Sequence, residues 1–210
     1  LGSRGLGDVY KRQFEDSPVD EIVIVCSADY IEYFRHSIIE KYGFKKVKAI
    51  VQGGKERYNS VYEGLKAANG TDYVLIHDGA RPLVDNEIIV RSMHTVEKEQ
   101  ACVAGMPVKD TIKVSDELGY SANTPDRKSL WQIQTPQCFE YDLLAQSYDK
   151  LFSDMSYGKN VPAITDDAMI VEYGSDTKVK LIEGSYENIK VTTPEDMGIA
   201  ELFLKKRRKM

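Results

Sequence analysis

The 210-residue sequence has few cysteines and no long uninterrupted apolar run. Because a helix needs roughly 20 predominantly apolar residues to cross a bilayer, we expect no membrane-spanning segment and no membrane partner. The three cysteines, Cys26, Cys102 and Cys138, are odd in number and lack the close spacing of metal ligands. We interpret them as reduced, buried apolar side chains, which favours a cytoplasmic location.

The sequence also lacks an excess of basic residues. It contains 28 Lys and Arg against 33 Asp and Glu, so its formal net charge is -5 at pH 7. The basic cluster at residues 205–209 suits the C-terminus of a helix, where cations complement the helix dipole. Proteins that bind nucleic acids concentrate Lys and Arg to neutralise phosphates. We therefore expect a small-molecule ligand and no nucleic-acid partner.

From residue 21 onward, short β-branched runs alternate with longer amphipathic stretches. This pattern predicts an α/β fold, a mostly parallel sheet with helices on both faces. With 42% apolar residues, the chain is long enough for one substantial core and hence for one domain. The expected strands are residues 22–26, 47–51, 73–77, 101–107 and 178–182. The expected helices are residues 57–68, 86–98, 141–151, one starting near 165–167 and one starting at 193.

Two stretches depart from this rhythm. Residues 108–134 begin with alternating polar and apolar side chains, continue through a polar turn region at 117–126 and end in a second strand-like run at 130–133. This pattern predicts a β-arm projecting from the sheet. Residues 1–13 have neither helical nor strand periodicity. We interpret them as a non-native or misassembled leader ahead of a single domain over residues 14–210.

Residues 77–82, HDGARP, follow a predicted buried strand. In open α/β sheets ligands bind at the C-terminal ends of strands, so Asp78 and Arg81 are well placed for a substrate or a metal ion. Alternatively, Asp78 caps the following turn and Arg81 pairs with it. The segment alone supports either interpretation.

Residues 53–57, GGKER, also follow a predicted strand and open a helix. Two glycines let the backbone approach a flat ring or a phosphate, and the N–H groups of a helix start can donate to it. A plain tight turn is the alternative, and an isolated glycine pair favours it. Lys190 lies between apolar neighbours in a strand-like segment. It is either a charged residue that keeps an exposed edge strand from pairing with other chains or a cation directed at an anionic ligand.

Six segments in order resemble the methylerythritol phosphate cytidylyltransferase family: GGKER with a following serine, HDGARP, PVKDT, DR…LW…TPQ, TDD and NIKVTTPED. The resemblance extends from about residue 14 to the end. It implies a Rossmann-like nucleotidyltransferase fold and a homodimer joined through the β-arm. It also implies transfer of CMP from CTP to 2-C-methyl-D-erythritol 4-phosphate, a step of non-mevalonate isoprenoid synthesis, with pyrophosphate released and Mg²⁺ or another divalent cation offsetting charge.

The resemblance assigns roles to particular residues. Such a reaction must bring two anions together, so it depends on positioning and on cations. Metal ligands stay open, with Asp78 as a candidate. By resemblance, Asp78 and Arg81 line both substrates. Arg127 and Lys190 are the catalytic cations implied, with Arg127 serving the neighbouring subunit's site. The residues implied to hold the acceptor phosphate are Thr135, Thr165, Arg127 and Lys190, and those implied to bind the nucleotide are Gly53, Gly54, Lys55, Ser60 and Gly79.

One part of the family pattern is not found. The family begins with a strand, a Gly-rich loop containing an arginine and a Pro-Lys-Gln segment, whereas residues 14–22 already resemble the region beyond them. We therefore expect the chain as given to be inactive toward CTP. Two alternatives stay open: a ribitol-5-phosphate cytidylyltransferase and a non-catalytic dimerising fragment. Residues 126–131 and 165–167 favour the methylerythritol enzyme.

Overall fold

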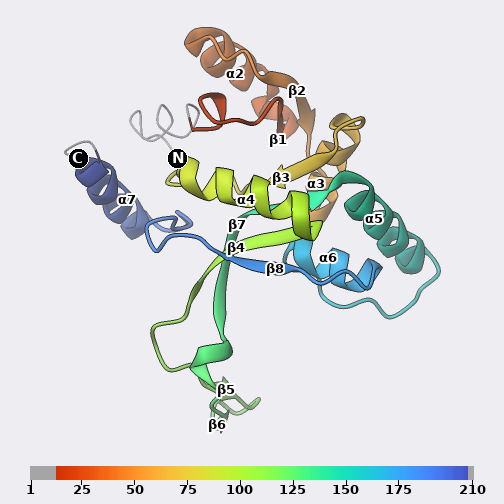
Figure 1. The fold of residues 1–210 in the computed structure, drawn as a ribbon, viewed down its shortest axis with the longest axis vertical. Coiled ribbons are helices and arrows are strands. Elements are labelled where there is room, and N and C mark those ends of the chain that lie inside the picture. Colours follow the sequence, from red (N-terminus) through yellow and green to blue (C-terminus); the bar gives the residue numbers. More distant parts are fainter. Residues whose placement is uncertain (1–12, 208–210) are drawn as a thin grey trace.

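The computed structural model describes residues 13–207, and Figure 1 shows an α/β fold from which a long arm projects. The expected leader, residues 1–13, lies outside the described residues except for its last position. The division of the chain into a leader and one domain therefore stays a prediction. Within residues 13–207 no helix has the length and apolar character needed to cross a membrane.

The described strands form a parallel pair, a four-stranded sheet and a small hairpin. In the four-stranded sheet the order is β3-β7-β4-β8, with β7 antiparallel to both neighbours and β8 parallel to β4. All the expected strands are present, with bounds within a few residues of the prediction. The strands are β1 (Ile22–Cys26), β2 (Val47–Gln52), β3 (Tyr73–Ile76), β4 (Ala101–Pro107), β5 (Val114–Ser115), β6 (Ser121–Asn123), β7 (Trp131–Glu140) and β8 (Lys180–Glu183).

The expected helices are also confirmed. The side chain of Asp85 accepts from the backbone N–H of Ile88 and so caps α4, while Asp196 accepts from the N–H groups of Thr192 and Thr193 at the start of α7. Residues 28–40, for which the sequence predicted nothing, are helical. The helices are η1 (Ala28–Tyr30), α2 (Ile31–Phe34), η2 (Arg35–Glu40), α3 (Arg57–Ala67), α4 (Asn86–Glu99), η3 (Arg127–Ser129), α5 (Tyr141–Ser156), α6 (Asp167–Gly174) and α7 (Pro194–Arg207).

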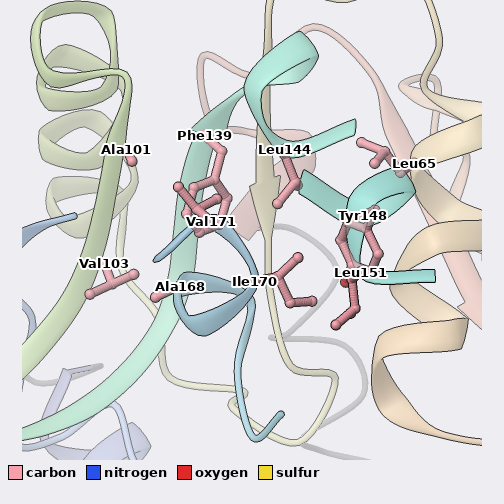
Figure 2. Packing of buried hydrophobic residues seen from close by; sticks show 10 residues of the cluster. All are labelled: Leu65, Ala101, Val103, Phe139, Leu144, Tyr148, Leu151, Ala168, Ile170 and Val171. Carbon is pink, nitrogen blue, oxygen red and sulfur yellow. The ribbon is translucent and has the colours of Figure 1, made fainter. Parts of the chain in front are cut away.

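The central strands β4 and β7 are buried, because neighbouring side chains of a strand point to opposite faces of the sheet and helices cover both faces. On β4, Ala101 and Val103 belong to the cluster drawn in Figure 2, which packs against α5 and α6. Cys102 and Ala104 belong to a second cluster that includes Ile89 of α4. This two-sided burial explains why β4 is a nearly continuous apolar run, and it confirms the α/β class.

The arm is present, but its return run differs from the expectation. Strands β5 and β6 pair antiparallel and lie far from the sheet in Figure 1. Residues 130–133, assigned to the arm from sequence, lead into β7, which continues as a ten-residue strand between β3 and β4. The sheet is therefore mixed, because a returning arm strand that pairs with β4 must run opposite to it.

Candidate active site

A cavity of about 250 Å³ lies beyond the C-terminal end of β3. Its wall combines the loop after β3, the first residue of α3, the middle of β7, the start of α6 and the segment before α7. Segments far apart in the chain thus meet at one place. The residues that line the cavity are Arg57, Asp78, Arg81, Ile133, Gln134, Thr135, Gln137, Thr165, Asp166 and Lys190.

Asp78 is the centre of the charged groups in this cavity. Its Oδ2 lies 3.0 Å from Nζ of Lys190 and 3.8 Å from Nε of Arg81, and its Oδ1 accepts from Nε of Arg57 at 3.3 Å. Burial alone would raise the pKa of Asp78, but Lys190 and Arg57 outweigh it and hold that pKa below the usual value. Asp78 is therefore ionised and surrounded by cations.

Arg57 links two carboxylates, and the sequence did not single it out as a functional residue. Besides contacting Asp78, it donates from Nη2 to Oδ2 of Asp167 at 2.7 Å. Asp167 is fully buried and also accepts from the hydroxyl of Tyr148 at 3.0 Å. Burial raises the pKa of Asp167, and Arg57 opposes that rise. Arg57 is the last residue of the GGKER motif, and this motif was the sequence signal from which its role could have been found.

The start of α6 closes one side of the cavity. The Asp166 side chain caps the helix by accepting from the N–H of Met169 at 3.0 Å, and its other oxygen accepts from Nε2 of Gln137 at 3.1 Å. Thr165 is exposed at the cavity, with its hydroxyl 3.2 Å from Sδ of Met169. An exposed hydroxyl at a helix start is well suited to an anion.

The glycine loop before α3 folds tightly onto the first turn of that helix. The N–H of Gly54 donates to Oγ of Ser60 at 3.1 Å, and a Cβ atom at Gly53 would lie 2.7 Å from the same oxygen. Lys55 is exposed, as is Gly79 in the loop after β3. These residues do not line the described cavity, but Arg57 connects their loop to it.

Arg127 lies on the arm, in η3, and is exposed. Its Nη1 donates to the carbonyl of Lys109 at 2.8 Å. It is not among the residues that line the cavity of its own chain, whereas Lys190 is. Among the residues assigned to the acceptor phosphate, Thr135, Thr165 and Lys190 thus come together, and the placement of Arg127 in a neighbouring subunit stays a prediction.

The described residues do not fit a resident divalent cation. No group of three or more His, Cys, Asp or Glu within residues 13–207 is arranged to hold a metal ion. Asp78 and Asp167 are engaged by cations, and Asp166 by N–H donors. Mg²⁺ is commonly held through a few carboxylates together with substrate phosphates and water, so these engaged carboxylates leave it few ligands in the described part of the chain.

Comparison with known proteins decides the family. The family model described as 2-C-methyl-D-erythritol 4-phosphate cytidylyltransferase matches residues 11–206. This chain belongs to that family. The cytidylyltransferase of that name from Lachnospira eligens is 49% identical over 195 residues, covering 92% of this chain and 84% of that protein. The one from Alkaliphilus oremlandii is 50% identical over 191 residues, covering 90% and 78%.

Solved structures of cytidylyltransferases confirm the fold. The crystal structure of 4-diphosphocytidyl-2C-methyl-D-erythritol synthase from Anaerococcus prevotii matches with a TM-score of 0.86 at 33% identity, covering 98% of this chain and 88% of that chain. The enzyme from Thermus thermophilus matches with a TM-score of 0.75 at 25% identity, covering 98% and 91%. The Rossmann-like nucleotidyltransferase fold and the classification as a cytidylyltransferase are thereby confirmed.

Proposed function

We propose that this enzyme transfers CMP from CTP to 2-C-methyl-D-erythritol 4-phosphate, releasing pyrophosphate and forming 4-diphosphocytidyl-2-C-methyl-D-erythritol, and that the cavity beside Asp78 binds the acceptor. The relatives from Lachnospira eligens and Alkaliphilus oremlandii are named for this reaction, and this chain covers most of their length. The observation that carries the site assignment is the convergence of Lys190, Arg81 and Thr165 on one cavity. These are the residue types that bind a phosphorylated polyol.

Lys190 is the cation best able to move from protein to substrate. Its side chain is 45% exposed, and its Nζ lies 3.0 Å from Asp78, so a small rotation exchanges a carboxylate oxygen for a phosphate oxygen. Arg57 is held by Asp78 and Asp167 and is less free to turn. Lys190 therefore offsets the repulsion between acceptor phosphate and triphosphate, while Arg57 keeps Asp78 in place.

The charges of the cavity support a contribution from a second subunit. Three cations and two carboxylates line it, so its own charges nearly cancel. A phosphate dianion gains more when another fixed cation is added, and Arg127 on the projecting arm is such a cation. Apolar side chains on the arm are strongly exposed, among them Leu118 at 82% and Tyr120 at 70%, which favours a homodimer formed through the arm.

The divalent cation and the location follow from the same residues. We propose that Mg²⁺ arrives on the phosphates of CTP and offsets their charge there, because the described carboxylates are already engaged. The cysteines Cys26, Cys102 and Cys138 are free, and Cys102 and Cys138 are buried. Buried unjoined thiols suit a reducing compartment, which supports a cytoplasmic location.

The assignment is tested by calorimetric binding of each acceptor, together with pyrophosphate release from CTP by a protein in which the family's N-terminal strand, glycine-rich loop and Pro-Lys-Gln segment replace residues 1–13. All rate measurements proposed below use that extended protein, because the chain as given is expected to be inactive toward CTP. We expect both with 2-C-methyl-D-erythritol 4-phosphate, and much less of both with ribitol 5-phosphate. Equal or greater binding and turnover with ribitol 5-phosphate would transfer the assignment to a pentitol-phosphate enzyme. A dimer that binds neither acceptor would support the non-catalytic alternative.

A further inference from the structure

His77 sits at the end of β3, directly before Asp78, and joins three segments around the cavity. Its Nε2 lies 3.0 Å from the carbonyl oxygen of Arg81, and its Nδ1 lies 3.0 Å from Oγ1 of Thr135. The same Thr135 oxygen accepts from the backbone N–H of Asp78 at 3.0 Å. The ring also packs against Phe14, with ring centroids 5.1 Å apart.

The chemistry of these partners fixes the position of each proton. A carbonyl oxygen can only accept, so Nε2 of His77 carries a proton and donates a hydrogen bond to the carbonyl oxygen of Arg81. Burial lowers the pKa of His77 to about 4, so the ring is neutral near pH 7 and Nδ1 must accept. The hydroxyl of Thr135 therefore donates to Nδ1 while its oxygen accepts from Asp78.

We infer that His77 is a positioning residue that orients the Thr135 hydroxyl as a hydrogen-bond acceptor toward the substrate and ties down the loop that carries Asp78 and Arg81. The only proton of that hydroxyl is committed to His77, and one lone pair is taken by the N–H of Asp78. One lone pair is left for a ligand in the cavity that Thr135 lines.

This arrangement changes the role of Thr135 within the proposed function, on which this step rests. Phosphate oxygens accept hydrogen bonds, so a hydroxyl without a proton to donate is a poor partner for them. A hydroxyl group of the sugar alcohol can donate to the lone pair of Thr135. Thr135 therefore recognises a hydroxyl of the acceptor chain, while Lys190 and Thr165 are left to the phosphate.

The proton arrangement is tested without any substrate by long-range ¹H–¹⁵N spectra of the imidazole rings, with His77→Asn identifying its signals among the three histidines. We expect a neutral ring protonated at Nε2 from pH 5 to 8, because burial lowers its pKa to about 4 and the charges of Asp78 and Arg81, which act on it among the described residues, have opposite effects. Exposed His36, whose pKa is raised by its hydrogen bond to Glu40, should instead become charged as the pH falls. A charged ring at pH 7, or a proton on Nδ1, would overturn the inference.

The role in positioning is tested with three replacements of His77. Asparagine places an acceptor near the site of Nδ1, glutamine places a donor near the site of Nε2, and phenylalanine keeps the ring packing but neither hydrogen bond. Since one hydrogen bond changes an equilibrium by about fivefold, we expect the acceptor KM to rise about fivefold for His77→Gln, more for His77→Phe and least for His77→Asn, with the CTP KM little changed. Losses that instead follow thermal stability, with both KM values shifted alike, would indicate a structural role only.

The role of Thr135 is tested by calorimetric binding of acceptor analogues that each lack one hydroxyl. The wild-type protein should bind one analogue about fivefold or more weakly than the parent acceptor, and Thr135→Val should abolish that difference. If Thr135→Val weakens every phosphate-bearing analogue alike, Thr135 binds the phosphate and the inference is wrong. If the wild-type protein binds none of them, the proposed acceptor is wrong, and the imidazole spectra still decide the direction of the protons.

Discussion

Replacing Gly54 with alanine should damage the glycine loop at its most crowded point. A Cβ atom there would lie 2.4 Å from Cβ of Asn59 and 3.2 Å from its carbonyl carbon. Both atoms belong to the first turn of α3 and cannot rotate away, so the loop or the helix start must shift. The shift would also break the hydrogen bond from the N–H of Glu56 to Oδ1 of Asn59, which is 3.1 Å long.

The expected cost of Gly54→Ala is about 2–4 kcal/mol, because overpacking costs about 1–3 kcal/mol and loss of the helix-capping contact about 1 kcal/mol. Gly53→Ala should cost less, since its Cβ would meet the hydroxyl of Ser60, which can rotate. Gly198→Ala is the matched control: position 198 lies in α7 with open space around it, so alanine should stabilise by about 0.5–1 kcal/mol.

Equilibrium urea unfolding of the three variants measures these differences, and initial rates measure the KM for CTP. If this loop binds the nucleotide, Gly54→Ala raises the KM for CTP far more than the KM for the acceptor. A Gly54→Ala protein with the unfolding midpoint and the CTP KM of the wild type would refute both the crowding and the nucleotide assignment. Weakened acceptor binding with normal CTP binding would refute the assignment alone.

Three further predictions concern the charged groups. Mixing Arg127→Ala and Lys190→Ala proteins under conditions of subunit exchange should restore about one quarter of wild-type turnover, because half of the dimers are hybrids with one intact site; no recovery would refute a shared site. Asp167→Asn should lower the free energy of unfolding in urea by about 1–3 kcal/mol. This is less than the full effect of breaking a buried ion pair because the Arg57 side chain is 34% exposed, and Tyr148→Phe should lower it less still. Because the pKa of Asp78 is lowered by folding, its ionisation stabilises the native state above about pH 4, and this stability is lost as the pH falls through the native pKa. Asp78→Asn should flatten that acid limb of the stability curve, and an unchanged limb would contradict the assignment.

Much of the fold could be predicted because its signals are local. Strand β4 is apolar at six successive buried positions, as two-sided burial requires. The caps of α7 follow from Thr193, Pro194 and Asp196, which act within one turn of chain. Such signals depend only on neighbours in sequence, so they can be recognised without knowledge of the tertiary structure.

Strand β7 could not be predicted in the same way, because its central residues are polar. Gln134 and Gln137 are buried, and Pro136 lacks the N–H that a central strand normally donates. Oε1 of Gln137 accepts from the N–H groups of Asp167 and Ala168, which lie 30 and 31 residues further along the chain. Hydrogen bonds to these distant partners offset the cost of burying the amide side chains, and no local sequence pattern reveals such partners.

The same distinction separates the site residues that were anticipated from those that were not. Asp78 stands out because it follows a predicted buried strand, and Lys190 stands out because it lies between apolar neighbours in sequence. Arg57 and His77 act through contacts to Asp167 and Thr135, which are 110 and 58 residues away. Their roles therefore depend on the meeting of strands and helices that only the folded chain shows.

The charged groups around the cavity form one continuous series rather than independent pairs. Asp167 at the start of α6 pairs with Arg57, Arg57 pairs with Asp78, and Asp78 pairs with Lys190. Arg57 also opens α3, whose glycine loop is the proposed nucleotide site. We therefore predict that a displacement of that loop by CTP reaches Asp78 through one guanidinium and changes the affinity of the cavity for the acceptor, and equal acceptor affinities with and without CTP would refute this coupling.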